Sequence, residues 1–202
     1  MENKEKFLKI FEEKITREGS KELKEKLLKS DFFTAPASTK YHGAYEGGLV
    51  EHVLNVYKRL NELIELYYEK SETKPSEETV AIIALLHDIS KMNFYTVQLR
   101  NVKNEETGQW EKVPYYAIRE AKERFTFGTH SENSLFMINS FMILSYEEQL
   151  SILHHMGGKD FTDDSNDSGK QSAEAYNKSK LALLLHMADM ASTFIDESNL
   201  VE

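Results

Sequence analysis

The chain has 202 residues and a mass of 23.4 kDa, which corresponds to one domain of ordinary size or to a domain with a small addition. Hydrophobic residues make up 40% and charged residues 29%, a balance that excludes collagen-like, low-complexity and wholly disordered proteins. The absence of cysteine excludes disulfides, thiolate nucleophiles and cysteine-held zinc or iron–sulfur sites. Any metal must therefore be held by imidazole and carboxylate groups.

The chain carries a formal net charge of -9. This charge disfavours non-specific adhesion to nucleic acid, which depends on Lys and Arg displacing counterions from phosphates. The apolar runs are far shorter than the roughly 18 residues that a membrane span needs, and the N-terminus lacks the apolar segment of a signal peptide. We therefore predict a cytoplasmic protein with no membrane partner. The sequence does not indicate an oligomeric state.

The chain is predicted to begin with two helices. Residues 3–29 have apolar residues at helical spacing on both sides of Gly19, which predicts two short amphipathic helices. We expect residues 1–30 to form a helical hairpin that packs on a core domain of residues 31–202. The aperiodic stretch 31–48 is expected to be a loop that leads into the next helix.

Two further helices are predicted after this loop. An apolar stripe from Leu49 to Tyr67 predicts a helix over about 49–68. Ser76 is a candidate N-cap for the next helix, in which residues 80–89 are apolar enough to be buried on most sides. This second helix is expected to be the central one.

The second half of the chain starts with a change of pattern. Residues 93–118 contain two β-prone segments around a polar turn, which predicts a β-hairpin with aromatic pairing. Capping-box signatures predict that helices begin near His130 and Tyr146 and extend to about 141 and 155. The last helix is predicted over about 172–195. The expected fold is all-α, a helical bundle with a small β-hairpin insertion.

A His-Asp dipeptide, His87-Asp88, ends the predicted central helix. The residues before it are Ala-Ile-Ile-Ala-Leu-Leu, so two adjacent ionisable groups would be costly there unless they are paired or bound to a metal. If the helix continues, Lys91 returns to the face of His87 and places a cation where a phosphate oxygen can lie. This segment is the first candidate for a catalytic site.

Other ligand-type side chains recur on separate predicted helices: His52, His130, His155 and Asp189. Each one alone is more often a hydrogen-bonded core or cap residue than a ligand. Imidazole and carboxylate groups suit Mn²⁺, Fe²⁺, Co²⁺, Ni²⁺ or Zn²⁺ better than Ca²⁺, and an open coordination position lets a bound water ionise near neutral pH. Taken together with the His-Asp dipeptide, the set predicts a divalent transition-metal site.

The order of these residues and the short motifs around them resemble the HD superfamily of metal-dependent phosphohydrolases. The matching motifs are Gly-Gly-Leu-Val-Glu-His ending at His52, Leu-Leu-His-Asp-Ile-Ser-Lys ending at Lys91, Gly-Thr-His-Ser around His130, and His-Met-Ala-Asp ending at Asp189. The resemblance covers about residues 41–195 and implies the helical bundle of an HD domain. Residues 33–45 are similar to the HD domains attached to bacterial 3'-5' exoribonucleases, and standalone bacterial and phage HD proteins are similar as well.

The resemblance implies a ligand set and catalytic roles. The implied metal ligands are His52, His87, Asp88, Asp189, His130 and His155, holding one or two divalent ions per chain. A second, weaker ion would be held by His130, His155 and a bridging Asp88. Asp88 would hold metal and aim the attacking water, and Lys91 would stabilise a non-bridging phosphate oxygen.

Two departures from the family's pattern affect this ligand set. The usual His-Asp-x-Gly-Lys has Ser90 in place of the glycine and keeps the lysine. Met156 separates the adjacent histidines from the following glycines, so His154 and His155 are alternatives. With Leu150 marking the buried side, helical geometry favours His154, which follows it by four residues. The family's register favours His155, which we predict as the ligand.

Three histidines are weaker candidates for contacts to the substrate or behind a ligand. His154 is one of them, as the alternative to His155. His186 lies three residues before Asp189 and so near the same helical face. His42 lies in the predicted loop before the third helix. For each of them a structural role is the alternative interpretation.

Three functions are compatible with these residues. The first is hydrolysis of a phosphate ester of a nucleotide or related small molecule by metal-activated water, which suits an acidic chain of this size. The second is a single-strand nuclease or phosphodiesterase, favoured by the exoribonuclease resemblance and by the basic and aromatic side chains of the predicted hairpin: Tyr95, Arg100, Lys103, Trp110, Lys112, Tyr115 and Tyr116. The third is a catalytically silent metal-binding regulatory module. We predict the first, with a small phosphate ester as partner and nucleic acid as the alternative partner.

Overall fold

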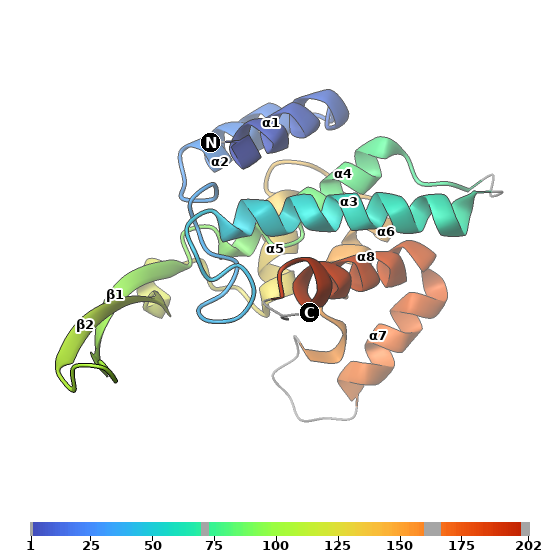
Figure 1. Cartoon of the computed structure of the whole chain (residues 1–202). Coiled ribbons are helices and arrows are strands. Elements are labelled where there is room, and N and C mark those ends of the chain that lie inside the picture. Colours follow the sequence, from blue (N-terminus) through green and yellow to red (C-terminus); the bar gives the residue numbers. More distant parts are fainter. Residues whose placement is uncertain (1, 70–72, 160–166, 199–202) are drawn as a thin grey trace.

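The computed structural model describes residues 2–69, 73–159 and 167–198. Within these ranges the chain is mostly helical, and a two-stranded antiparallel sheet projects from the helical body (Figure 1). The helices are α1 (Glu2–Lys14), α2 (Ser20–Leu28), α3 (Gly48–Tyr68), α4 (Glu77–Leu86), α5 (His130–Asn139), α6 (Tyr146–Leu153), α7 (Asp167–Lys178) and α8 (Lys180–Ala191). The strands are β1 (Tyr95–Lys103) and β2 (Trp110–Ile118). Among the described residues, no helix combines the length and the apolar composition that a membrane crossing requires.

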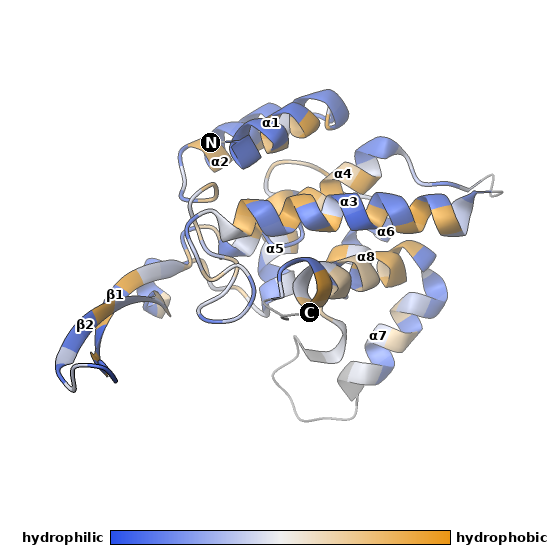
Figure 2. Ribbon diagram, viewed as in Figure 1, coloured by the Kyte–Doolittle hydropathy of each residue, from blue (hydrophilic) through white to orange (hydrophobic). Residues whose placement is uncertain are grey.

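The core is built around α4, which is buried on all sides from Val80 to its end. All residues from Val80 to Leu86 are buried, and α3 packs against both α4 and α8. Figure 2 shows apolar positions alternating with polar ones along α3, as expected for a helix with one buried stripe. The predicted N-cap of α4 is present, because the Ser76 hydroxyl accepts a hydrogen bond from the Thr79 amide at 3.1 Å. The polar residues that follow α4 are therefore carried into the interior.

The two N-terminal helices contribute to the same core. Phe7 of α1 and Leu23 of α2 are fully buried, and α1 contacts α3 and α4. The connection between α1 and α2 depends on Gly19, whose φ is +86°. A Cβ atom at this position would lie 1.8 Å from the Phe141 carbonyl oxygen, so any larger residue would be strained and would clash. The expected division of the chain at residue 30 stays a prediction.

Both predicted capping boxes are present, in Thr129 with Glu132 and in Ser145 with Glu148. In each box the hydroxyl accepts from a backbone amide and the carboxylate accepts from the backbone of the capping residue. These local hydrogen bonds begin α5 and α6 where the sequence predicts. The two helices end at Asn139 and Leu153 rather than at 141 and 155, because the last turn of a helix is not defined by the apolar pattern alone.

A partly buried ion pair joins the α1–α2 connection to α6. The Arg17 guanidinium donates two hydrogen bonds to Glu148, from Nη1 to Oε2 at 2.7 Å and from Nη2 to Oε1 at 2.9 Å. The Glu148 side chain is fully buried and also accepts from the Thr79 hydroxyl and the Ser145 amide. Burial raises the pKa of Glu148, but these donors outweigh burial and hold the pKa below its usual value. The carboxylate therefore stays charged in the interior.

Replacing Arg17 with methionine is expected to lower the free energy of unfolding by about 3 kcal/mol, because the Glu148 carboxylate is left buried without its cation. Since the folded pKa of Glu148 is depressed, its contribution to stability is present above about pH 4.5 and is lost as the pH falls through its folded pKa. The difference between the two proteins in urea unfolding should therefore shrink on acidification. The control Lys24→Ala removes a surface ion pair with Glu12 and should cost less than about 1 kcal/mol. Equal stability of wild type and Arg17→Met at pH 7 would contradict this account.

Strands β1 and β2 form the predicted hairpin, with a register that starts at the pair of Tyr95 and Ile118. The prediction of aromatic pairing is wrong, because no aromatic residue in the described register lies directly opposite another. Tyr115 instead lies opposite Gln98, and its hydroxyl donates a hydrogen bond to the Gln98 side-chain oxygen at 2.9 Å. Polar cross-strand contacts of this kind hold the hairpin.

The predicted last helix is in fact two helices followed by a turn of π type. Helix α7 ends at Lys178 and α8 begins at Lys180. Ser179 leaves helical geometry between them, and its hydroxyl accepts a hydrogen bond from the Ala182 amide at 3.1 Å. The prediction of one continuous helix is therefore wrong, because a serine inside an apolar pattern fits a helix interior as easily as an N-cap. After α8 the chain forms the π-type turn Ser192–Asp196.

Candidate metal centre

The His-Asp pair lies where α4 ends. His87 keeps helical dihedral angles, Asp88 leaves the helix with a φ of -104°, and Ile89–Lys91 form a 3₁₀ turn. The helix therefore does not continue to Lys91. The predicted position of Lys91, on the face of His87, assumed a continuous helix, and that assumption is wrong. The tighter turn still returns Lys91 to the site, because its Nζ atom lies 2.5 Å from Asp88 Oδ2. The contact is a direct ion pair with Asp88.

Three imidazole nitrogens converge around Asp88. The Nε2 atoms of His52 and His87 lie 3.6 Å and 3.7 Å from Asp88 Oδ2. The Nε2 atom of His155 lies 3.5 Å from Asp88 Oδ1. Asp189 Oδ1 lies 3.1 Å from the Nε2 atom of His52. These buried side chains come from α3, the end of α4, the segment after α6, and α8, so only the tertiary structure brings them together.

The opposite nitrogens of these rings are already engaged. His87 Nδ1 lies 2.9 Å from the Ala84 carbonyl oxygen, and His155 Nδ1 lies 2.7 Å from the Ile152 carbonyl oxygen. Because a carbonyl only accepts, each Nδ1 donates its proton, and in the neutral ring the lone pair lies on Nε2. In the described part of the chain, the Nε2 atoms of His52, His87 and His155 have no hydrogen-bond partner. Buried ring nitrogens on histidines that are oriented from behind are typical of metal ligands.

His130 reaches the same carboxylate from the first turn of α5. Its Nε2 atom contacts Asp88 Oδ1, and its Nδ1 atom lies 2.8 Å from Ser90 Oγ. Ser90 therefore has a specific contact at the position where the family's pattern has glycine. A hydroxyl at this position orients a predicted metal ligand, which a glycine cannot do.

Asp88 and Lys91 are both charged in this environment. Burial raises the pKa of Asp88, but Lys91 and His130 outweigh it and hold the pKa well below its usual value. Burial lowers the pKa of Lys91, but Asp88 and Tyr95 outweigh it and the pKa is raised. A stable ammonium group therefore lies beside the carboxylate at the centre of the site.

The two histidines nearest to Asp88 Oδ2 differ in charge. Burial is the main cause that lowers the pKa of His87 to about 3, so its ring is neutral at physiological pH. Burial also lowers the pKa of His52, but the carboxylates of Asp189 and Glu197 outweigh it and raise the pKa to about 10. The same carboxylates attract any cation at His52 Nε2, where a metal ion would compete with the proton.

The donor set fits a divalent transition metal. Among the described residues, three groups offer ligand atoms that lie within 4.8 Å of one another: His52, His87 and Asp189; His87, Asp88 and His155; and His42, His52 and Glu197. Neutral imidazole combined with carboxylate is preferred by Mn²⁺, Fe²⁺, Co²⁺, Ni²⁺ and Zn²⁺ over Ca²⁺. The predicted ligands are thus gathered at one place with atoms for one or two ions.

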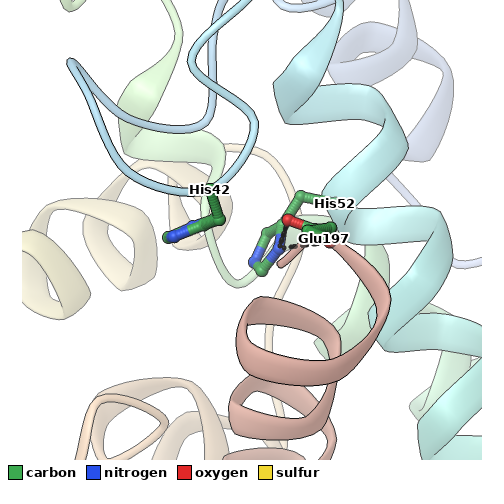
Figure 3. A group of neighbouring side chains, drawn as sticks. All are labelled: His42, His52 and Glu197. Atoms are coloured by element: carbon green, nitrogen blue, oxygen red, sulfur yellow. Dashed lines mark hydrogen bonds and ion pairs between the residues drawn. The ribbon is translucent and has the colours of Figure 1, made fainter. Parts of the chain in front are cut away.

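A pocket of about 660 Å³ opens beside these donors. Its lining includes Asp88, Asp189 and Lys91 from the site, together with His42 from the loop before α3. The ring centroid of His42 lies 5.0 Å from that of His52, and Figure 3 shows His42 reaching the site from this loop. His42 is therefore placed where it can contact a ligand in the pocket.

His186 lines the same pocket and also supports a predicted ligand. Its Nδ1 atom lies 2.6 Å from the carbonyl oxygen of His155, and its ring stacks on Tyr176 with centroids 5.5 Å apart. Gly157 passes close to these rings with a φ of +62°, and a Cβ atom there would lie 3.2 Å from His186. His186 thereby holds the backbone that carries His155.

His154 points away from the site. Its Nδ1 atom lies 3.4 Å from Ser172 Oγ, and its side chain lines a separate pocket with Leu150. The weaker expectation that His154 contacts the substrate is therefore not met. Leu150 is only partly buried, whereas Ile152 is fully buried and precedes His155 by three residues. The expectation that Leu150 marks the inward side of α6 is wrong, because the inward face is that of Ile152.

This geometry predicts different results for the two adjacent histidines. Replacing His155 with alanine is expected to remove the weaker of two Mn²⁺ binding events, because the Nε2 atom that faces Asp88 is lost. Replacing His154 with alanine should leave both events unchanged. Calorimetric titration of Mn²⁺ into both variants distinguishes these results. Loss of the weaker event only in His154→Ala would refute the assignment, and a single event in wild type would remove the second metal altogether.

The site also contains Glu197, which no sequence motif identifies. Its carboxylate lies 3.1 Å from His52 Nδ1, on the side of the ring opposite to Nε2 (Figure 3). Glu197 follows the last predicted helix and has neither a motif nor a periodic position. Only the path of the chain after α8 places it there.

Comparison with known proteins agrees with this geometry. A curated protein of Methanocaldococcus jannaschii, named dihydroneopterin 2',3'-cyclic phosphate phosphodiesterase, is 39% identical to this chain over 57 residues. The similar stretch covers 28% of this chain and only 23% of that protein. No solved structure matches the chain. The HD domain matches residues 49–192, a range that includes both His52 and Asp189, and the chain belongs to the HD domain family.

Proposed function

We propose that this protein is a metal-dependent phosphohydrolase that hydrolyses a phosphate ester of a nucleotide or related small molecule. The observation that supports it most is the convergence of the Nε2 atoms of His52, His87 and His155 with the carboxylates of Asp88 and Asp189 beside a pocket of about 660 Å³. A divalent ion held by these residues would supply a Lewis acid that lowers the pKa of water and neutralises phosphate charge.

The residues of the chain would hold the metal ions and neutralise charge on the substrate. His52, His87 and Asp189 are suited to hold one ion together with Asp88, which would bridge to a second ion held by His130 and His155. Lys91 lines the pocket with its ammonium group, where it can donate to a non-bridging oxygen of the substrate. Phosphoryl transfer depends mainly on such positioning and charge neutralisation.

The pocket favours a small substrate with an apolar part. Its volume lies in the range of small-molecule sites, roughly 300 to 1,000 Å³. Besides the polar groups near the candidate metal centre, its lining includes four large apolar or aromatic side chains, Tyr41, Met156, Met190 and Phe194. These can pack on a flat ring while the phosphate faces the polar groups. The similar Methanocaldococcus jannaschii protein is named as a phosphodiesterase of a 2',3'-cyclic phosphate, which supports a small phosphate ester as the substrate.

The nuclease alternative has less support. None of the hairpin residues, 95–118, is among the described residues that line the pocket. Trp110 is 70% exposed, and Arg100 stacks on Tyr115 within the hairpin at 5.5 Å from the ring centroid. A strand bound to these residues would therefore need a path to the site that the pocket lining does not provide.

Turnover assays with purified protein and Mn²⁺ test the proposal. The substrates are nucleoside monophosphates, 2',3'-cyclic nucleotides, a chromogenic phosphodiester, and single-stranded RNA and DNA. We expect a small ester to be hydrolysed, with loss of the activity in the presence of a chelator. The matched control His154→Ala removes a histidine that lies outside the site and should keep full activity. Degradation of oligonucleotides alone would favour the nuclease, and Mn²⁺ binding without any turnover would favour the regulatory module.

A further inference from the structure

The ring of His52 lies between two carboxylates. Its Nε2 atom is 3.1 Å from Asp189 Oδ1, and its Nδ1 atom is 3.1 Å from Glu197 Oε1. Glu197 Oε1 also accepts a hydrogen bond from the Asn55 side-chain amide at 3.1 Å. The Glu197 side chain is only 2% exposed, so it is a buried contact rather than a surface charge. Glu197 therefore touches the side of the His52 ring opposite to the candidate ligand nitrogen.

The π-type turn after α8 explains how Glu197 reaches this place. In a continuous α-helix, eight residues rotate by two turns and about 80° more, so Glu197 would not lie on the face of Asp189. The Glu197 amide instead donates to the Ser192 carbonyl oxygen at 3.0 Å, a hydrogen bond over five residues. Such a turn rotates less per residue than an α-helix and returns Glu197 towards the face of Asp189.

Helix α3 binds this turn along one face. His52, Asn55 and Arg59 follow one another at spacings of three and four residues, so they share a side of the helix. Arg59 donates to both oxygens of Asp196, from Nε at 2.8 Å and from Nη2 at 2.5 Å. The bidentate pair and the Asn55 hydrogen bond together hold the segment that carries Glu197.

We propose that Glu197 is a positioning residue for the metal ligand His52, an inference that rests on the metal-binding part of the proposed function. The carboxylate accepts the proton of Nδ1, so that a metal ion that displaces the Nε2 proton meets a nitrogen already oriented towards Asp88 and Asp189. A carboxylate behind a histidine also makes the imidazole a stronger donor to a metal. Glu197 lies beyond residues 49–192, so it is a feature of this chain outside the region that the family matches.

Mn²⁺ affinity of the full chain, measured by titration calorimetry, tests the positioning role without any substrate. Glu197→Ala is expected to raise the dissociation constant of the tighter binding event about 10- to 100-fold. Glu197→Gln should have a smaller effect, because the amide oxygen still accepts from Nδ1. The matched control Glu65→Gln removes an exposed carboxylate from α3, the helix that carries His52, and should leave the affinity unchanged. In Zn²⁺-loaded protein, ¹⁵N NMR should show a proton on His52 Nδ1 in wild type and its loss to rapid exchange in Glu197→Ala.

The outcomes separate this role from the proposed function. Wild type that binds no Mn²⁺ would refute the proposed metal site itself and the positioning role with it. Wild-type binding together with unchanged affinity in a folded Glu197→Ala protein would overturn the positioning role alone. If the alanine variant does not fold, Glu197→Leu fills the same space and makes the same test. An equal loss of affinity in His42→Ala would show that His42 and Glu197 bind the ion directly, which would also overturn a positioning role.

Discussion

Replacing Asp88 with alanine is expected to abolish metal binding and to lower phosphate-ester hydrolysis by about 10³-fold or more. Asp88 is 2% exposed, and both of its oxygens are used. Oδ1 contacts His130 and faces His155, and Oδ2 pairs with Lys91 at 2.5 Å. No other described residue contacts as many of the predicted ligands, so its loss leaves each candidate ion with too few donors.

Elemental analysis of protein purified without chelator measures this effect directly. Wild type should carry at least one transition metal per chain, and Asp88→Ala should carry none. Asp88→Asn keeps the volume of the side chain and separates loss of charge from loss of packing. As a control, Glu25→Gln removes an exposed carboxylate and should retain both metal and activity. A folded Asp88→Ala protein with a full complement of metal would refute the assignment of this residue.

Replacing Lys91 with alanine is expected to lower the rate by about 10²-fold while the protein keeps its metal and its fold. The ammonium group lies 2.5 Å from Asp88 and lines the pocket, so it can neutralise charge that develops on the phosphate. Removal of a cation makes the site more negative and does not weaken the binding of a metal cation. The loss should therefore appear in kcat rather than in Mn²⁺ affinity.

Lys91→Arg is the informative companion, because it restores the charge with a different shape and should recover part of the rate. Steady-state kinetics and Mn²⁺ titration on the same preparations separate catalysis from metal binding. Equal kcat in wild type and Lys91→Ala would show that this charge serves only to neutralise Asp88. Loss of metal in the variant would show that the ion pair is needed to assemble the site.

Features with local hydrogen bonds or a strong apolar period could be predicted from the sequence. The capping boxes at Thr129 and Ser145 place the starts of α5 and α6 without help from the rest of the fold. The buried helix α4, the N-cap at Ser76 and the hairpin 95–118 follow from patterns within a few residues. The ordered ligand-type residues, from His52 to Asp189, also gave the family, which the match over residues 49–192 confirms.

Other features depended on contacts between distant segments. Ser179 divides the last predicted helix, because its hydroxyl is used as an N-cap rather than within a helix. The choice between His154 and His155 depends on which face of α6 meets the core, and Leu150 was a misleading guide because it borders a separate pocket. A partly buried leucine and a core leucine are the same letter in the sequence.

Residue type and order in the chain were sufficient to predict the mainly helical class, the family and the chemical identity of the donors. How these donors meet depends on the packing of the helices, which places Nε2 atoms around Asp88, turns Nδ1 atoms to carbonyls, and brings Glu197 behind His52. The physical reason is that orientation of a ring depends on hydrogen bonds between segments far apart in the chain, here 145 residues apart for His52 and Glu197. A turn with hydrogen bonds over five residues, which no local pattern predicted, completes that arrangement.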